Sequence, residues 1–118
     1  MPTQGGLMPE SNTRTALTEA VYYILLALNT PLHGYGIMQL VTELSHNRVN
    51  LGSGTLYGAI NTLQKKGWIQ LYSEVKTKGK KEYLITPLGT QVVQSEIERL
   101  KELYLCGVNI TGGDFDAS

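Results

Sequence analysis

The stretch SGTLYGAINTLQKKGWI, residues 53–69, has the pattern of an amphipathic helix with an unusual outer face. At about 100° per residue, its apolar residues fall on one buried stripe, formed by Leu56, Ala59, Ile60 and Leu63. The opposite face is small and polar, with Tyr57 and Thr62 at its margins, and consists of Gly54, Gly58, Asn61 and Lys65. An exposed glycine costs a helix about 0.5–1 kcal/mol relative to alanine, although less near its first turn, where Gly54 lies. We therefore interpret this face as one that a close-fitting partner approaches.

The ends of this helix and the segment after it predict a helix followed by a β-hairpin. Ser53 is the expected N-cap, and Gly67 ends the helix, where Lys65 and Lys66 suit its negative C-terminal end. Residues 68–75 and 81–86 are strand-like, and Tyr83 and Ile85 share one face of the second strand. The turn between them is basic, with Gly79 among Lys76, Lys78, Lys80 and Lys81.

Three further helices are predicted, two before this helix and hairpin and one after them. Residues 17–30 form a helix that is apolar on almost every side, which favours burial against a second subunit as well as the core. Residues 32–46 form the next helix, entered through His33 and Gly34. The last helix is capped by Thr86, begins at Pro87 and carries a narrow heptad-like seam of Val93, Ile97, Leu100 and Tyr104.

Charge is unevenly distributed along a chain whose formal net charge is zero. Residues 48–81 contain seven basic residues and one acidic residue, whereas residues 82–118 contain two basic and six acidic residues. A basic middle suggests a polyanionic partner, although a solvated charged hairpin would have the same composition.

Length and composition predict one domain of 118 residues with flexible ends. The expected organisation is an N-terminal arm (1–13), a folded domain (14–86), a last helix (87–106) and a tail (107–118). A single cysteine, Cys106, cannot form an internal disulfide, which favours the cytoplasm. No leader peptide is expected, because residues 1–14 contain no apolar core region. No membrane span is expected either, because the longest apolar run, residues 20–28, is far shorter than a span requires.

Three helices, a basic two-stranded hairpin and a trailing helix predict a fold that is α+β and mostly α. The expected architecture is a winged helix-turn-helix DNA-binding domain (14–86) with a C-terminal dimerisation helix (87–106). In this fold a recognition helix enters a major groove about 12 Å wide, and small residues on its outer face let the backbone come close. The lysines of the hairpin then reach the phosphate backbone.

Three motifs in order resemble the PadR family of bacterial transcriptional regulators, specifically its short subfamily with one C-terminal helix. They are HGYGI at residues 33–37, GTLY leading to GWI over residues 54–69, and YLITPLG at residues 83–89. Gly36 replaces a more common acidic residue, and Ile85 departs slightly from the usual leucine–threonine step. The resemblance covers about residues 17–105.

The resemblance implies a homodimeric repressor that binds a palindromic double-stranded DNA operator. The residues of this chain that we expect to bind DNA are Tyr35, Ser53, Gly54, Thr55, Tyr57, Gly58, Asn61, Lys65, Lys66, Lys78, Lys80 and Lys81. Its expected dimer interface is formed by Leu17, Val21, Tyr22, Tyr23, Val93, Ile97, Leu100 and Tyr104. Any pocket for a small aromatic or hydrophobic effector would use the same residues, which a plain dimer core also needs. Trp68 is expected in the core and not in a ligand site.

Two other classes of function remain open at this stage. A winged helix can serve as a protein- or RNA-binding module, but such a module more often has apolar residues where this chain has glycine, asparagine and lysine. An enzyme is the weaker alternative, because His33, His46 and Cys106 are too scattered for a metal or nucleophile site. We therefore expect no catalytic residue, no cofactor and no metal.

Overall fold

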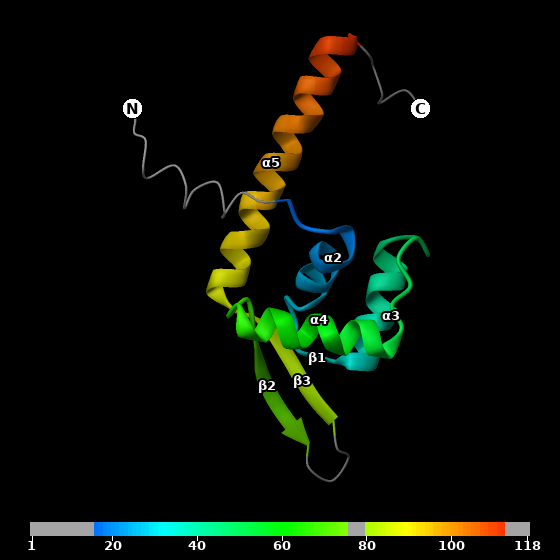
Figure 1. The fold of residues 1–118 in the computed structure, drawn as a ribbon, viewed down its shortest axis with the longest axis vertical. Coiled ribbons are helices and arrows are strands. Elements are labelled where there is room, and N and C mark those ends of the chain that lie inside the picture. Colours follow the sequence, from blue (N-terminus) through cyan, green and yellow to red (C-terminus); the bar gives the residue numbers. More distant parts are fainter. Residues whose placement is uncertain (1–15, 76–79, 113–118) are drawn as a thin grey trace. The chain divides into compact units, whose positions relative to one another are not determined.

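The computed structural model describes residues 16–75 and 80–112, with Val75 described by its backbone only. The elements in chain order are α2 (Glu19–Ala27), β1 (Leu32–His33), α3 (Gly34–Leu44), α4 (Ser53–Lys65), β2 (Ile69–Val75), β3 (Lys80–Ile85) and α5 (Pro87–Thr111) (Figure 1). They belong to two compact units, one of Leu17–Val93 and one that contains α5 from Gln94 onward. The predicted arm (1–13) and the hairpin tip with Lys76 and Lys78 lie outside the described residues.

The core of the Leu17–Val93 unit forms where the apolar stripes of its elements meet. Thr18 starts α2 by accepting a hydrogen bond from the Val21 N–H (3.1 Å), and Ile24 and Leu25 on this helix are fully buried. The predicted stripe of α4 is also buried, with Ala59 at its edge. The core cluster comprises Ile24, Leu25, Leu28, Ile37, Val41, Leu56, Ile60, Leu63, Ile69, Tyr83 and Val93.

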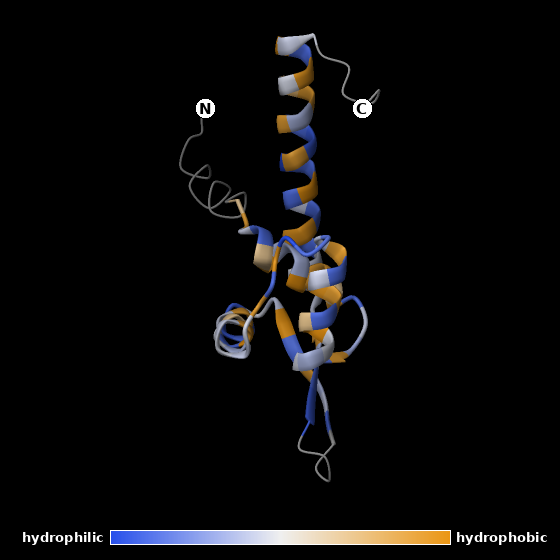
Figure 2. Cartoon of the chain, turned by 90° about the vertical axis from the view of Figure 1, so that its right-hand side faces the viewer, coloured by the Kyte–Doolittle hydropathy of each residue, from blue (hydrophilic) through white to orange (hydrophobic). Residues whose placement is uncertain are grey.

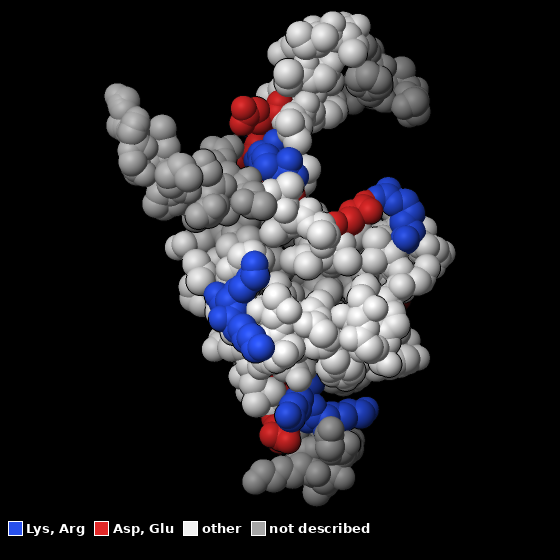
Figure 3. Space-filling model, viewed as in Figure 1, with Lys and Arg blue, Asp and Glu red and all other residues white. Residues whose placement is uncertain are grey.

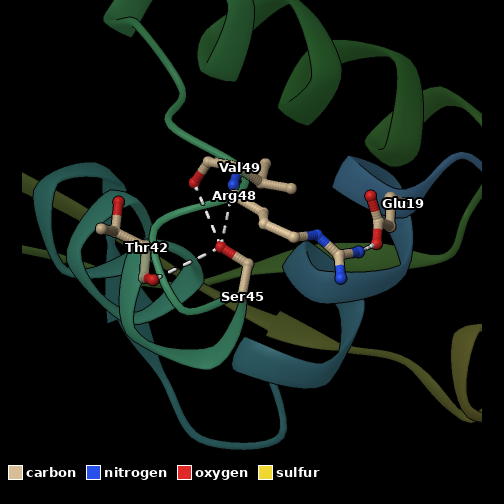
Figure 4. A network of polar contacts seen from close by, with 5 residues as sticks. All are labelled: Glu19, Thr42, Ser45, Arg48 and Val49. Atoms are coloured by element: carbon tan, nitrogen blue, oxygen red, sulfur yellow. Dashed lines mark hydrogen bonds and ion pairs between the residues drawn. The ribbon is translucent and has the colours of Figure 1, made fainter.

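The turn between α3 and α4 is held by buried polar contacts (Figure 4). The Ser45 hydroxyl accepts a hydrogen bond from the Val49 N–H (2.9 Å) and donates to the Thr42 carbonyl (3.3 Å). An ion pair between Arg48 and Glu19 connects this turn to the first turn of α2. The pair is exposed and therefore contributes little energy, so Ser45 is the main polar anchor of the helix-turn-helix.

Glycines mark both ends of α4, and one end differs from the prediction. Ser53 was expected as the N-cap, but that prediction is wrong: Gly52 occupies the N-cap position and Ser53 is the first helical residue. Glycine is nearly as good as serine at this position, so the helix begins one residue earlier without a side-chain cap. Gly67 ends the helix as predicted, with φ +78° and a hydrogen bond from the Trp68 N–H to the Leu63 carbonyl (3.0 Å).

The sheet has three antiparallel strands in the order β1-β3-β2. β2 and β3 form the predicted hairpin, paired from Ile69 with Ile85 to Val75 with Lys80, with a bulge between Leu71 and Ser73. The short strand β1 was not predicted, because residues 32–33 were assigned to the helix that follows. It pairs Leu32 with Tyr83 and so places the start of α3 beside β3.

The first turn of α5 is fixed against the segment that joins α4 to β2. The Thr86 hydroxyl accepts a hydrogen bond from the Gly89 N–H (3.0 Å), as the predicted cap requires, and donates to the Gly67 carbonyl (2.6 Å). A Cβ on Gly89 would overlap the Trp68 carbonyl oxygen, so the helix and this segment meet backbone to backbone. α5 continues to Thr111, and the predicted tail from residue 107 is therefore wrong for residues 107–111.

Within the described ranges, no helix is both long enough and apolar enough to cross a membrane.

Candidate nucleic-acid interface

The outer face of α4 is open, as the sequence predicts. Gly54, Gly58, Asn61 and Lys65 are all exposed. A Cβ added to Gly54 or Gly58 would have no atom within 4 Å in the structure, so internal packing does not require either glycine. The cost of these glycines to helix stability is offset by nothing inside the fold, and this points to a partner outside it.

The remaining predicted DNA-binding residues also reach the surface wherever the structure describes them. Tyr35, Thr55, Tyr57, Lys80 and Lys81 are exposed, as are Ser53 and Lys66, whereas Lys78 lies outside the described residues. Lys66 lies round the side of α4, with its Nζ 4.7 Å from the centre of the Trp68 ring. Trp68 itself is half-buried against the core, as predicted.

In the view of Figure 3, basic side chains border a largely uncharged surface at its left and below it, where an acidic side chain lies beside them. Residues 53–64, which form most of α4, contain no charged residue. Lys65 and Lys66 lie at the C-terminal end of the helix, and Lys80 and Lys81 lie on β3. This arrangement suits a polyanion whose two charged edges are separated by a groove that α4 can enter.

A cavity of about 240 Å³ lies where the start of α3, α4 and β3 come together. Its lining residues are His33, Gly34, Tyr35, Tyr57, Lys80, Lys81 and Tyr83. A Cβ on Gly34 would overlap the Tyr57 hydroxyl, so a side chain at position 34 would require the Tyr57 side chain to move away. His33 caps α3 by accepting a hydrogen bond from the Gly36 N–H at Nδ1 (3.2 Å).

Sequence reasoning identified only four of these lining residues as site residues: Tyr35, Tyr57, Lys80 and Lys81. It placed Tyr83 only on one face of the second strand, shared with Ile85, and assigned His33 and Gly34 only to the entry of a helix. The HGY motif was a signal for the latter two, but nothing in the sequence indicated that β1 would bring them beside β3.

The expected dimer residues divide into two groups. Leu17, Val21, Tyr22 and Tyr23 are half-buried at the edge of the core, and Val93 is only 7% exposed. Val93 was predicted at the interface, but it packs inside its own protomer because the first turns of α5 contribute to the core. Farther along α5, hydrophobic residues recur to the end of the helix (Figure 2), and the exposed ones include Ile97, Leu100, Leu103, Tyr104, Leu105 and Ile110.

No group of three metal-ligating side chains occurs in the part of the chain that the structure describes. Cys106 is exposed on α5, and its helix continues beyond it.

Comparisons with known proteins agree with this geometry. Residues 24–95 match the model of the "Transcriptional regulator PadR-like family". An uncharacterized 37.1 kDa protein in transposon TN4556 of Streptomyces fradiae is 34% identical over 87 residues, which cover 72% of this chain. They cover 24% of that protein, so the chain spans about a quarter of the relative it matches.

Solved structures show the same fold. A transcriptional regulator from Clostridium thermocellum has a TM-score of 0.62 at 27% identity, and the match covers 76% of this chain and 88% of that one. A PadR family transcriptional regulator from Eggerthella lenta has a TM-score of 0.62 at 22% identity, covering 90% and 89%. Because the family model matches more than half of its length, this chain belongs to the PadR-like family of transcriptional regulators.

Proposed function

We propose that the protein is a homodimeric transcriptional repressor that binds a palindromic DNA operator with α4 in the major groove. The observation that carries this proposal is the open outer face of α4, where two glycines meet no atom of the chain. Such a face lets the helix backbone approach base edges more closely than side chains of ordinary size would allow.

The two protomers of the proposed dimer associate through the exposed apolar residues of α5. Closed two-fold symmetry is the commonest arrangement of soluble homo-oligomers, and it presents two copies of α4 to the DNA. The operator then contains two half-sites whose centres are about 34–36 Å apart, or a multiple of that distance.

Selection of binding sequences from random duplexes, followed by fluorescence anisotropy at two salt concentrations, tests the proposal. We expect an enriched sequence with two inverted half-sites, bound at least about 1,000-fold more tightly than unrelated DNA. Repeating the titration with small hydrophobic compounds tests whether an effector releases the DNA, as the family resemblance implies. Equal affinity for all duplexes would contradict operator recognition, and a reporter gene that the protein activates would contradict repression.

Asn61 is expected to contribute to sequence choice. It lies on the outer face of α4, and its amide can both donate to and accept from one base edge. Asn61→Ala should cost about 1–3 kcal/mol at one operator position and leave affinity for unrelated DNA unchanged. Anisotropy titrations against operators mutated at each position measure this. An equal loss on all sequences would identify Asn61 as a backbone contact.

Lys81 is expected to contact the phosphate backbone. Lys81→Ala should weaken binding to every duplex by the same factor and reduce the slope of log affinity against log salt by about one unit. Lys101→Ala, which removes the same charge from α5, is the matched control and should leave that slope unchanged. A loss confined to the operator would show that Lys81 reads bases.

A further inference from the structure

The cavity between α3, α4 and β3 is lined by a mostly buried tyrosine whose hydroxyl group has no partner within the described residues. Tyr83 is only 6% exposed and lines this cavity. Within residues 16–75 and 80–112, the Tyr83 hydroxyl makes no hydrogen bond, whereas no fully buried side-chain nitrogen or oxygen there is left unsatisfied. The hydroxyl must therefore reach solvent, and the cavity is where it does so.

The groups around this hydroxyl are nearly all hydrogen-bond donors. Tyr57 contributes a second hydroxyl, and Lys80 and Lys81 contribute two ammonium groups. His33 accepts through Nδ1, which leaves Nε2 of the neutral ring as an N–H donor. The cavity also lies beside the first turn of α3, whose backbone N–H groups give that end a positive partial charge.

The acidic residues beside the cavity do not line it. Glu74 is paired opposite Lys81 in the hairpin, and Glu82, which is paired opposite His33, accepts a hydrogen bond from the Ser73 hydroxyl (2.8 Å). The pKa of the Tyr83 hydroxyl is raised above its ordinary value, mainly because the group is buried. The charges of Tyr57 and Glu74 raise this pKa further, by smaller amounts. Tyr83 therefore keeps its proton at neutral pH and acts as a donor. A concave site that offers several donors and two positive charges suits an anion with several acceptor oxygens.

We propose that this cavity binds one phosphate group of the DNA backbone, with the Tyr83 hydroxyl as a direct hydrogen-bond donor to it. The choice of DNA rests on the function proposed above, because Tyr57 connects the cavity to the margin of the α4 outer face. The bound phosphate would fix the wing and the start of α3 against the same strand. Tyr83 thus has two roles: its ring packs in the core, and its hydroxyl positions the duplex.

Tyr83→Phe tests the proposal, since it removes the hydroxyl and keeps the ring. We expect affinity for the operator and for an unrelated duplex to fall by the same factor, about tenfold. The salt slope should stay unchanged because no charge is lost, which distinguishes this variant from Lys81→Ala. Tyr72→Phe is the matched control, because Tyr72 is 57% exposed on β2 and does not line the cavity. The Tyr72→Phe protein should bind DNA with wild-type affinity. Wild-type affinity of a folded Tyr83→Phe protein would overturn the proposal.

A second measurement separates the cavity from the function of the whole protein. Inorganic phosphate, added to the full chain and followed by NMR, should shift the backbone amides of residues 34–36 in the wild type but not in Tyr83→Phe. If the wild type bound no duplex at all, the proposed function would fail. If phosphate still shifted those amides, the DNA source would be overturned in favour of a free phosphorylated compound. Duplex binding without any phosphate-dependent shift, together with normal binding by Tyr83→Phe, would overturn the phosphate site and leave the proposed function intact.

Discussion

Gly58→Leu is expected to abolish operator binding in a protein that is at least as stable as the wild type. Gly58 lies in the middle of α4, and a Cβ there meets no atom of the chain within 4 Å. Leucine gains up to about 1 kcal/mol of helix propensity over glycine, which raises the melting temperature by about 4–8 °C. The same side chain would hold α4 away from the groove. Loss of two or more contacts worth about 1–3 kcal/mol each lowers the affinity by about 100-fold or more.

Thermal denaturation and anisotropy titration of the same protein samples measure the two opposite effects. Gly58→Ala is the graded control, because alanine gains at least as much helix propensity as leucine and adds one carbon atom. It should be as stable as Gly58→Leu and lose much less affinity. Gly58→Leu protein that melted normally and bound the operator like the wild type would show that DNA does not approach this face. The outer face of α4 would then need another partner.

The helices and the hairpin could be predicted because their local signals agree with their tertiary environment. Leu56, Ile60 and Leu63 have helical spacing in the sequence, and the same three residues of α4 are buried in the core. Gly67 and Thr86 were predictable for a related reason. Helix ends need a left-handed residue or a side-chain cap, and few residue types supply either.

The predicted ends of α4 and α5 were wrong because the local sequence signals there were weak or favoured two positions equally. Gly52 and Ser53 are both acceptable N-caps, so the first residue of α4 was uncertain by one position. The end of α5 was placed too early because Gly107 and the residues after it have low helix propensity. The helix continues nonetheless, with the Thr111 hydroxyl donating to the Gly107 carbonyl (2.9 Å).

The cavity that contains Tyr83 could not be predicted because it depends on tertiary pairing. β1 is two residues long, too short for any periodicity, yet its pairing with β3 brings His33 and Gly34 beside Tyr83. A tyrosine on an apolar strand face is normally interpreted as core, and the ring of Tyr83 is core. Only the environment of its hydroxyl distinguishes a structural tyrosine from one that also binds a ligand.

The exposed apolar residues of α5 support the prediction of a dimer. The predicted seam positions Ile97, Leu100 and Tyr104 are exposed, whereas the next positions of the same spacing, Gly107 and Thr111, are not apolar and do not extend the seam. Exposed apolar residues on one helix favour association with a second copy of the helix. We therefore expect sedimentation at micromolar concentration to give twice the chain mass of 13.0 kDa.

Leu100→Glu should convert this dimer into monomers. Leu100 is 40% exposed within the single chain, so a glutamate there leaves the protomer folded, whereas in the interface its charge would be buried without a partner. The monomer should lose at least about 100-fold in affinity for an operator with two half-sites, because the two copies of α4 no longer bind as one unit. Its weak binding to a single half-site should remain that of one wild-type protomer. Sedimentation and anisotropy measure these two effects independently.

Leu105→Glu is the matched control, since Leu105 is 45% exposed and lies on the same helix. At about 100° per residue, it lies roughly 140° round the helix from Leu100 and therefore off the seam. The same charge placed there should leave the dimer intact and operator affinity unchanged. The reverse result, with Leu105→Glu monomeric and Leu100→Glu dimeric, would move the interface to the other side of α5. If both variants stayed dimeric, α5 would not be the dimerisation helix, and the two-fold operator would need a different interface to explain it.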